Sequence, residues 1–177
     1  MSLLDSTYFA NVDCSIPEGT YNTIDEHIER YERDILIQVL GYDLYKLVAA
    51  YDSGTSPQRI IDIVEGKEYT VGSYTVKWNG ILNSEKISFL AYYIFMKWIE
   101  NTISVQNVGV VANVTENGVV ISPAQAMQAA GMKARRLIGY PGNDAYAESL
   151  YNFLLYNEST YPEWLFSEFK PPNAFDL

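Results

Sequence analysis

The sequence predicts a mainly α fold: a compact bundle of about five helices with one small β-hairpin and an extended valine-rich segment. Three observations lead to this expectation. The stretch from Ser84 to Ile103 is apolar on nearly every side, residues 24–40 repeat apolar side chains at helical spacing, and residues 68–78 have the pattern of two short paired strands. At 177 residues, the chain has the length of one ordinary domain with a single core.

The composition indicates a globular protein that does not grip nucleic acid. Apolar residues make up 48% of the chain and charged residues 19%, a balance typical of a packed domain rather than a disordered chain. The formal net charge of −10 disfavours binding to a nucleic-acid backbone. Cys14 is the only cysteine, and residues 1–9 lack the features of a secretory signal, so we expect a protein of a reducing cytoplasm.

The first helix is expected after an N-terminal arm of residues 1–22, which is rich in turn formers. Thr23 and Glu26 have the spacing of a capping box, in which each side chain accepts a hydrogen bond from the other residue's backbone N–H. Gly41 follows the apolar repeat and predicts the end of this helix.

Two shorter helices and a hairpin are expected next. Residues 43–51 and 57–64 carry apolar side chains on one side, and Ser56-Pro57 is typical of a helix start. Strands at residues 68–71 and 74–78 flank Gly72-Ser73, and glycine in the first position of a two-residue loop favours a type II′ turn. A lone hairpin is marginally stable in water, so we expect it to pack on the helices or to pair with another chain.

The stretch Ser84 to Ile103 predicts the central helix, with Ser84 as its N-cap. Lys86, Lys97 and Glu100 interrupt the apolar run, which is therefore too short to cross a membrane. A helix that is apolar all round must be covered on every side, so we expect either the rest of the chain or another subunit to cover it.

The second half of the chain predicts an extended segment at residues 104–120, helices at residues 124–138 and 144–156, and an aromatic tail at residues 158–177. The extended segment is rich in valine, which suits an exposed loop or a strand added to a neighbour's sheet. The tail is too apolar for solvent and should dock on the body or on a partner. We therefore divide the chain into an arm (1–22), one helical domain (23–157) and the tail.

No group of residues predicts catalysis. His27 is the only histidine, which excludes a two-histidine zinc motif, and Cys14 has no other candidate base than this distant histidine. No glycine-rich phosphate loop is present. Lys133, Arg135 and Arg136 form one basic cluster, which fits the end of a helix better than a site for an acidic partner. We expect no enzyme activity, no cofactor and no bound metal.

Several segments nevertheless form a familiar series between Thr23 and Ile138. They are Ile24 to Glu32, Leu40 to Tyr45, Trp78 to Leu82, Ala91 to Phe95, Val108-Gly109-Val110, Glu116-Asn117-Gly118 and Ser122-Pro123. In order and spacing, this series resembles the head–tail connector (adaptor, head-completion) proteins of tailed bacteriophages and prophages.

The resemblance implies a structural, mainly helical subunit that forms a ring on the portal protein and contacts tail or stopper proteins. DNA would pass through the ring without being specifically bound. It also implies assembly in the cytoplasm of a bacterial host, a final place in the virion neck, and no membrane association. The apolar side chains that we expect at the interfaces with neighbouring copies or partners are Tyr92, Phe95, Trp98, Val108, Val110, Val111, Trp164, Phe166 and Phe169.

The alternative is a helical regulatory or ligand-binding domain, monomeric or dimeric, whose aromatic patches hold a small ligand or a peptide. The two classes differ in how copies associate. A ring subunit uses two different surfaces in a head-to-tail contact, whereas a dimeric binding domain uses one surface against itself.

Overall fold

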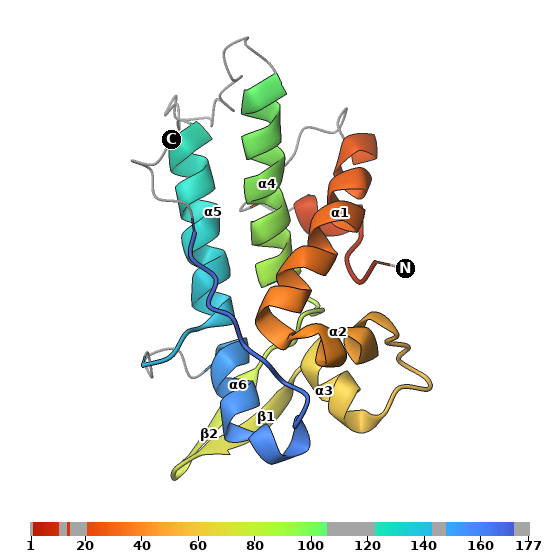
Figure 1. Cartoon of the computed structure of the whole chain (residues 1–177), viewed down its shortest axis with the longest axis vertical. Helices are drawn as coiled ribbons and strands as arrows, with labels where there is room; N and C mark the ends of the chain where they lie inside the picture. Colours follow the sequence, from red (N-terminus) through yellow and green to blue (C-terminus); the bar gives the residue numbers. More distant parts are fainter. Residues whose placement is uncertain (1, 11–13, 15–20, 106–122, 143–147, 172–177) are drawn as a thin grey trace.

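Three long helices stand side by side and form the body of the molecule (Figure 1). The computed structural model describes residues 2–10, 14, 21–105, 123–142 and 148–171. In chain order the elements are η1 (Ser6–Phe9), α1 (Tyr21–Leu40), α2 (Tyr42–Ala49), α3 (Gln58–Glu65), β1 (Lys67–Val71), β2 (Tyr74–Trp78), α4 (Phe89–Val105), α5 (Pro123–Ile138), α6 (Leu150–Tyr156) and η4 (Glu158–Thr160). The described residues thus form six α-helices and one two-stranded sheet, which confirms the mainly α prediction.

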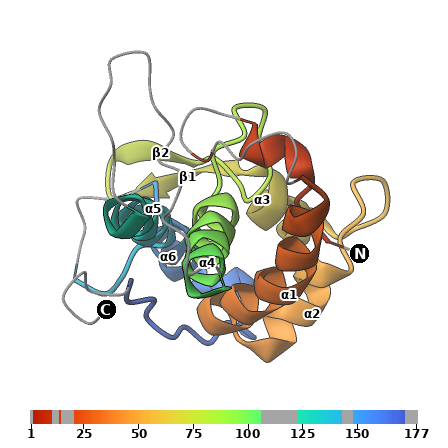
Figure 2. The same ribbon diagram turned by 90° about the horizontal axis from the view of Figure 1, so that it is seen from above.

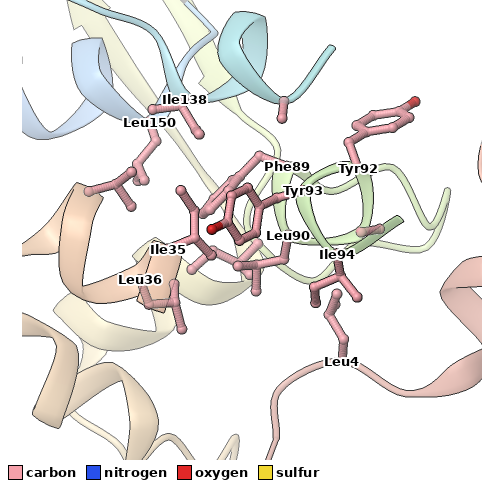
Figure 3. Packing of buried hydrophobic residues seen from close by; sticks show 14 of the residues in the cluster. Leu4, Ile35, Leu36, Phe89, Leu90, Tyr92, Tyr93, Ile94, Ile138 and Leu150 are labelled. Atoms are coloured by element: carbon pink, nitrogen blue, oxygen red, sulfur yellow. The ribbon is translucent and has the colours of Figure 1, made fainter. Parts of the chain in front are cut away.

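Helix α4 lies at the centre of the core, between α1 and α5 (Figure 2). Its first six residues, Phe89 to Ile94, are all buried. Side chains from four other parts of the chain surround them, among them Leu4, Ile35, Ile138 and Leu150 (Figure 3). The chain itself therefore covers this apolar stretch, and burial of residues 89–94 requires no second subunit.

The start of α4 differs from the prediction. Ser84 lies in a loop, and Ser88 precedes the helix, where its Oγ accepts a hydrogen bond from the backbone N–H of Leu90 at 3.3 Å. The loop is held by Asn83, whose side chain accepts from the N–H of Ile87 at 3.1 Å and donates to its C=O at 2.6 Å. Ser84 and Ser88 both precede the apolar run and could cap the helix. The hydrogen bonds between Asn83 and Ile87 hold the residues around Ser84 in a loop, so the helix starts after Ser88.

Other helix boundaries also move. Helix α1 begins at Tyr21, so Thr23 lies inside it and the capping box expected at Thr23 and Glu26 is wrong. Positions 21 and 22 hold neither proline nor glycine, so nothing in the sequence prevents the helix from starting there. Ser149 caps α6 with a hydrogen bond from the N–H of Asn152 at 3.3 Å, so this helix starts later than residue 144. Cap signals compete along a sequence, and the burial of the helix face selects among them.

The hairpin has the expected strands and the expected turn. Val71 pairs with Tyr74, and the register continues to Lys67 opposite Trp78. Gly72 has φ of 60°, as the first position of a type II′ turn requires. The sheet packs on α6 through Phe153, whose ring stacks at 6.3 Å from the Trp78 ring and meets Tyr69 edge-on at 5.5 Å.

The described part of the N-terminal arm belongs to the core. Leu4, Tyr8 and Phe9 are buried, as is Cys14. The buried carboxylate of Glu32 on α1 accepts hydrogen bonds from the backbone N–H groups of Leu3 and Leu4, at 2.9 to 3.1 Å. These contacts fasten the start of the chain to the middle of α1.

Residues 161–171 form a strap, named so here because they cross the side of the bundle from the end of α1 to α5 (Figure 2). The strap begins at Tyr161, whose hydroxyl donates to the C=O of Arg59 at 2.9 Å. It then pairs with the end of α1, where the N–H of Ser167 donates to the C=O of Gln38 at 2.9 Å. An ion pair of 2.7 Å between Glu168 and Arg135 holds it to α5. The aromatic tail therefore docks on the body of its own chain as far as residue 171.

The valine-rich segment lies almost entirely outside the described residues. Its first two residues, Ser104 and Val105, belong to α4 and are helical rather than extended. Val105 is helical despite the preference of valine for strands, because this preference is weak and α4 is held in the core from residue 89 to residue 94.

Candidate functional site

An open groove of about 990 Å³ lies at the hairpin end of the bundle. Strand β2 forms one wall, from Thr75 to Trp78, and the second half of α5 forms the other. Ile87, which is 40% exposed, and the half-buried Leu137 contribute apolar surface, while Phe89 and Tyr92 line the groove but are only 1% and 5% exposed. We call this feature the β2 groove.

The β2 groove carries balanced charge although the chain is strongly acidic. Its charged lining residues are Glu65, Lys77, Glu85, Lys133, Arg136 and Glu148, three acids and three bases. The ammonium of Lys133 lies 5.4 Å from the centre of the Tyr92 ring, a cation–π contact that covers part of the apolar surface. A groove without net charge suits an uncharged, partly apolar occupant better than a phosphate or a nucleic acid.

The segment Trp78 to Leu82 positions the groove by wrapping the end of α3. The indole N–H of Trp78 donates to the C=O of Ile63 at 2.8 Å, and the N–H of Leu82 donates to the C=O of Val64 at 2.7 Å. Gly80 has φ of +85°, and a Cβ there would lie 2.4 Å from the carbonyl carbon of Glu65. Only glycine fits where the chain passes so close to the end of α3. Trp78 to Leu82, one of the segments that resemble connector proteins, therefore holds the hairpin against α3.

The expected interface residues of α4 divide into two groups. Tyr92 is buried at 5% exposure, while Phe95 and Trp98 are half-buried and stack on each other at 6.0 Å between ring centres. Phe95 and Trp98 are thus partly exposed, whereas Tyr92 lines the β2 groove.

The three expected interface residues of the tail lie on the strap and face the body. Trp164 donates its indole N–H to the C=O of Val39 at 3.0 Å, and Phe166 packs against Tyr151 at 4.8 Å between ring centres. Phe169 is 5% exposed and meets Tyr93 edge-on. In this conformation their contacts are within the chain. The remaining three predicted residues, Val108, Val110 and Val111, lie outside the described residues.

Exposed apolar side chains elsewhere were not anticipated from the sequence. Tyr74 at the hairpin turn is 75% exposed, and Tyr156 on α6 is 48% exposed beside Tyr69. Leu165 on the strap is 72% exposed. The exposure of Tyr74 could have been predicted, because a residue next to a two-residue turn has few neighbours to cover it.

The only histidine and the only cysteine both belong to the packed part of the chain. His27 on α1 faces α4, where its Nε2 is 3.3 Å from the amide nitrogen of Asn101, which also donates to the Tyr31 hydroxyl at 2.8 Å. Cys14 is buried. Among the described residues, no three His, Cys, Asp or Glu side chains are grouped as a metal would require. None of the described helices is long and apolar enough to span a membrane.

Comparison with known proteins gives no relative: no protein-family model, no curated protein and no solved structure matches this chain.

Proposed function

We propose that this protein is a head–tail connector subunit of a tailed bacteriophage or prophage, which forms a ring on the portal protein through which DNA passes. The observation that carries the proposal is the ordered series of connector-like segments between Thr23 and Ile138. The role is structural, with no catalytic residue and no cofactor.

The connector-like segments contain no catalytic residues, but three of them lie at positions that shape the fold. Ala91 to Phe95 lies in the first two turns of α4, Leu40 to Tyr45 forms the α1–α2 corner, and Trp78 to Leu82 wraps the end of α3. All three build the framework. Their spacing supports a shared framework, and the connector function follows from the resemblance.

The charge of the chain also supports this function. A net charge of −10 per subunit gives a ring of many copies a strongly negative field. Acidic side chains on the lumen would repel the DNA backbone and let it slide without being held. Lumen-facing basic rings would contradict this part of the proposal.

The contacts within the chain change where the ring interfaces should be sought. The core covers α4 between Phe89 and Ile94, and the strap covers its own aromatic residues. Neither therefore requires a neighbouring copy. The surfaces that we propose for assembly are the β2 groove, the partly exposed pair Phe95 and Trp98, and exposed side chains such as Tyr74.

The proposed partners are the portal protein, tail or stopper proteins, and further copies of this chain. The corresponding locations are the host cytoplasm during assembly and then the virion neck. Mass photometry of the 20.1 kDa chain, alone and mixed with the portal protein encoded beside it, tests the proposal. A complex heavier than the portal by a ring of subunits supports it, and an unchanged portal mass at all chain concentrations contradicts it.

The second candidate is a binding domain, and the β2 groove is the observation that favours it. A volume of about 990 Å³ is at the upper end of the range for ligand sites. A thermal-shift screen with small ligands and peptides distinguishes this candidate, because a ligand of the groove raises the melting temperature without the portal.

A further inference from the structure

We infer that the open edge of β2 receives a strand from residues 108–114 of a neighbouring copy, so that the two-stranded sheet becomes three-stranded in the ring. This inference rests on the proposed function and names the contact that joins one subunit to the next.

One edge of β2 has backbone groups that the hairpin does not use for hydrogen bonds. Because a two-residue loop joins Val71 to Tyr74, that pair is hydrogen-bonded, and alternation makes Tyr69–Val76 the next such pair. Thr75 and Lys77 then direct their backbone N–H and C=O groups away from β1. No backbone hydrogen bond outside the helices and the hairpin involves either residue within the described parts of the chain.

The space beside that edge suits a strand in shape and in charge. Thr75 and Lys77 line the β2 groove, so a strand added to β2 lies in the groove, where Ile87 and Leu137 supply apolar surface. The groove has three acidic and three basic side chains, and therefore no net charge. Two copies of a chain with net charge −10 repel each other, and a contact through this groove adds nothing to that repulsion.

The proposed occupant fits the groove in charge, apolar surface and length. Residues 106–122 contain a single charged residue, Glu116. In an extended chain, alternate side chains share a face, which places Val108, Val110, Ala112 and Val114 together. This apolar face can pack on Ile87 and Leu137 of the groove. Residues 108–114 are seven and can therefore pair along the whole of β2, which has five residues.

The distance that the segment can span decides between the same copy and a neighbour. Helix α4 ends and α5 begins at the end of the bundle opposite to the hairpin (Figure 1). A path down the 17-residue α4, along β2 and back requires roughly 65 Å. The segment spans at most about 60 Å when fully extended. It therefore reaches the edge of a neighbour more easily than its own.

The contact is head-to-tail, because a segment at one end of a subunit meets a strand at the other end of the next. Such a heterologous contact repeats around a ring if the rotation closes. Main-chain hydrogen bonds provide the attraction, and the alternating valines select the register.

The test uses two proline variants that differ only in which sheet edge they block. Thr75→Pro removes an outward N–H from β2 without removing a hydrogen bond of the hairpin. Thr70→Pro is the matched control, because Thr70 lies directly opposite Thr75 and its N–H faces the other edge. A third variant replaces residues 108–114 by a Gly/Ser linker of equal length and leaves every described residue unchanged.

Each full-length variant is mixed with the portal protein, and ring formation is measured by native mass spectrometry. We expect wild type and Thr70→Pro to form rings, while Thr75→Pro and the linker variant lose ring formation at least about tenfold. Hydrogen exchange should show Thr75 and Lys77 amides protected in the wild-type ring and unprotected in the free chain.

The outcomes separate this inference from the proposed function. Rings formed equally by wild type, Thr75→Pro and the linker variant overturn the β2 contact and leave the connector function standing. A wild-type chain that forms no ring on the portal overturns both. If Thr75→Pro unfolds, the linker variant and the exchange of the wild-type amides decide, and unprotected Thr75 and Lys77 amides in the ring overturn the contact.

Discussion

Truncation of Tyr161 to alanine should destabilise the whole domain, because this side chain anchors the strap. Tyr161 is 1% exposed, its ring lies 5.8 Å from the Phe153 ring, and its hydroxyl donates to the C=O of Arg59. Loss of a buried aromatic side chain costs about 3–5 kcal/mol. In a chain of this size that lowers the melting temperature by about 6–20 °C.

Two variants of the strap make this prediction specific. Tyr161→Phe keeps the ring and loses one hydrogen bond, so the free energy of unfolding should fall by about 1 kcal/mol. Leu165→Ala removes a side chain that is 72% exposed, and the free energy of unfolding should change by less than about 0.5 kcal/mol.

The assay is thermal unfolding followed by circular dichroism, with urea unfolding as a second measure. The three variants should rank Tyr161→Ala, Tyr161→Phe and Leu165→Ala from most to least destabilised. A Tyr161→Ala protein that melts within about 2 °C of wild type would refute the docking of the strap on its own chain, and the aromatic tail would then be free for a partner.

Three further predictions concern other parts of the fold. Gly80→Ala should cost about 3 kcal/mol or more, measured by urea unfolding, whereas Gly72→Ala, whose Cβ meets nothing within 4 Å, should cost about 1 kcal/mol. Burial raises the pKa of Glu32, so the folded state holds this proton more tightly than the unfolded state does. The free energy of unfolding should therefore fall as the pH rises from the ordinary glutamate range through this raised pKa. Glu32→Gln should weaken this pH dependence, which is measured as the urea midpoint at a series of pH values. Burial raises the pKa of Tyr69 and of Tyr93 to about 12. Their stabilising contribution is therefore fully present below the ordinary tyrosine pKa and is lost as the pH rises from there through about 12, and absorbance titration should show both ionising only as the protein unfolds.

Local signals predicted the elements whose cause is local. Gly72-Ser73 between two short apolar patterns was sufficient for the hairpin, its register and its turn type, because only glycine takes the first position of that turn at low cost. The apolar repeat of α1 and the continuous apolar run of α4 were likewise sufficient to identify both helices.

Features that depend on distant contacts, or on a choice between two similar local signals, could not be predicted in the same way. The start of α4 depends on Asn83 holding Ile87, and the sequence offered Ser84 as an equally good cap. The wrapping of α4 by its own chain depends on where the arm and the strap dock. The sequence allowed either this chain or another subunit to cover that helix, and the described structure selects the first.

The candidate site was only partly predictable. The interface residues stay predictions: Tyr92 lines the β2 groove, and Trp164 and Phe169 contact other residues of their own chain. An aromatic side chain is apolar whether it contacts its own chain or a partner, so its type does not tell which. The groove itself brings together residues from β2, α4 and α5, and no pattern within one segment of the sequence reveals that meeting.

We propose that copies of this chain form a ring on the portal, and cryo-electron microscopy of the mixture is the sharpest test of this proposal. We expect a closed ring of head-to-tail subunits stacked on the portal, with a central channel wide enough for duplex DNA. Portal particles without added density, or a chain found only as a two-fold dimer that uses one surface against itself, would contradict it.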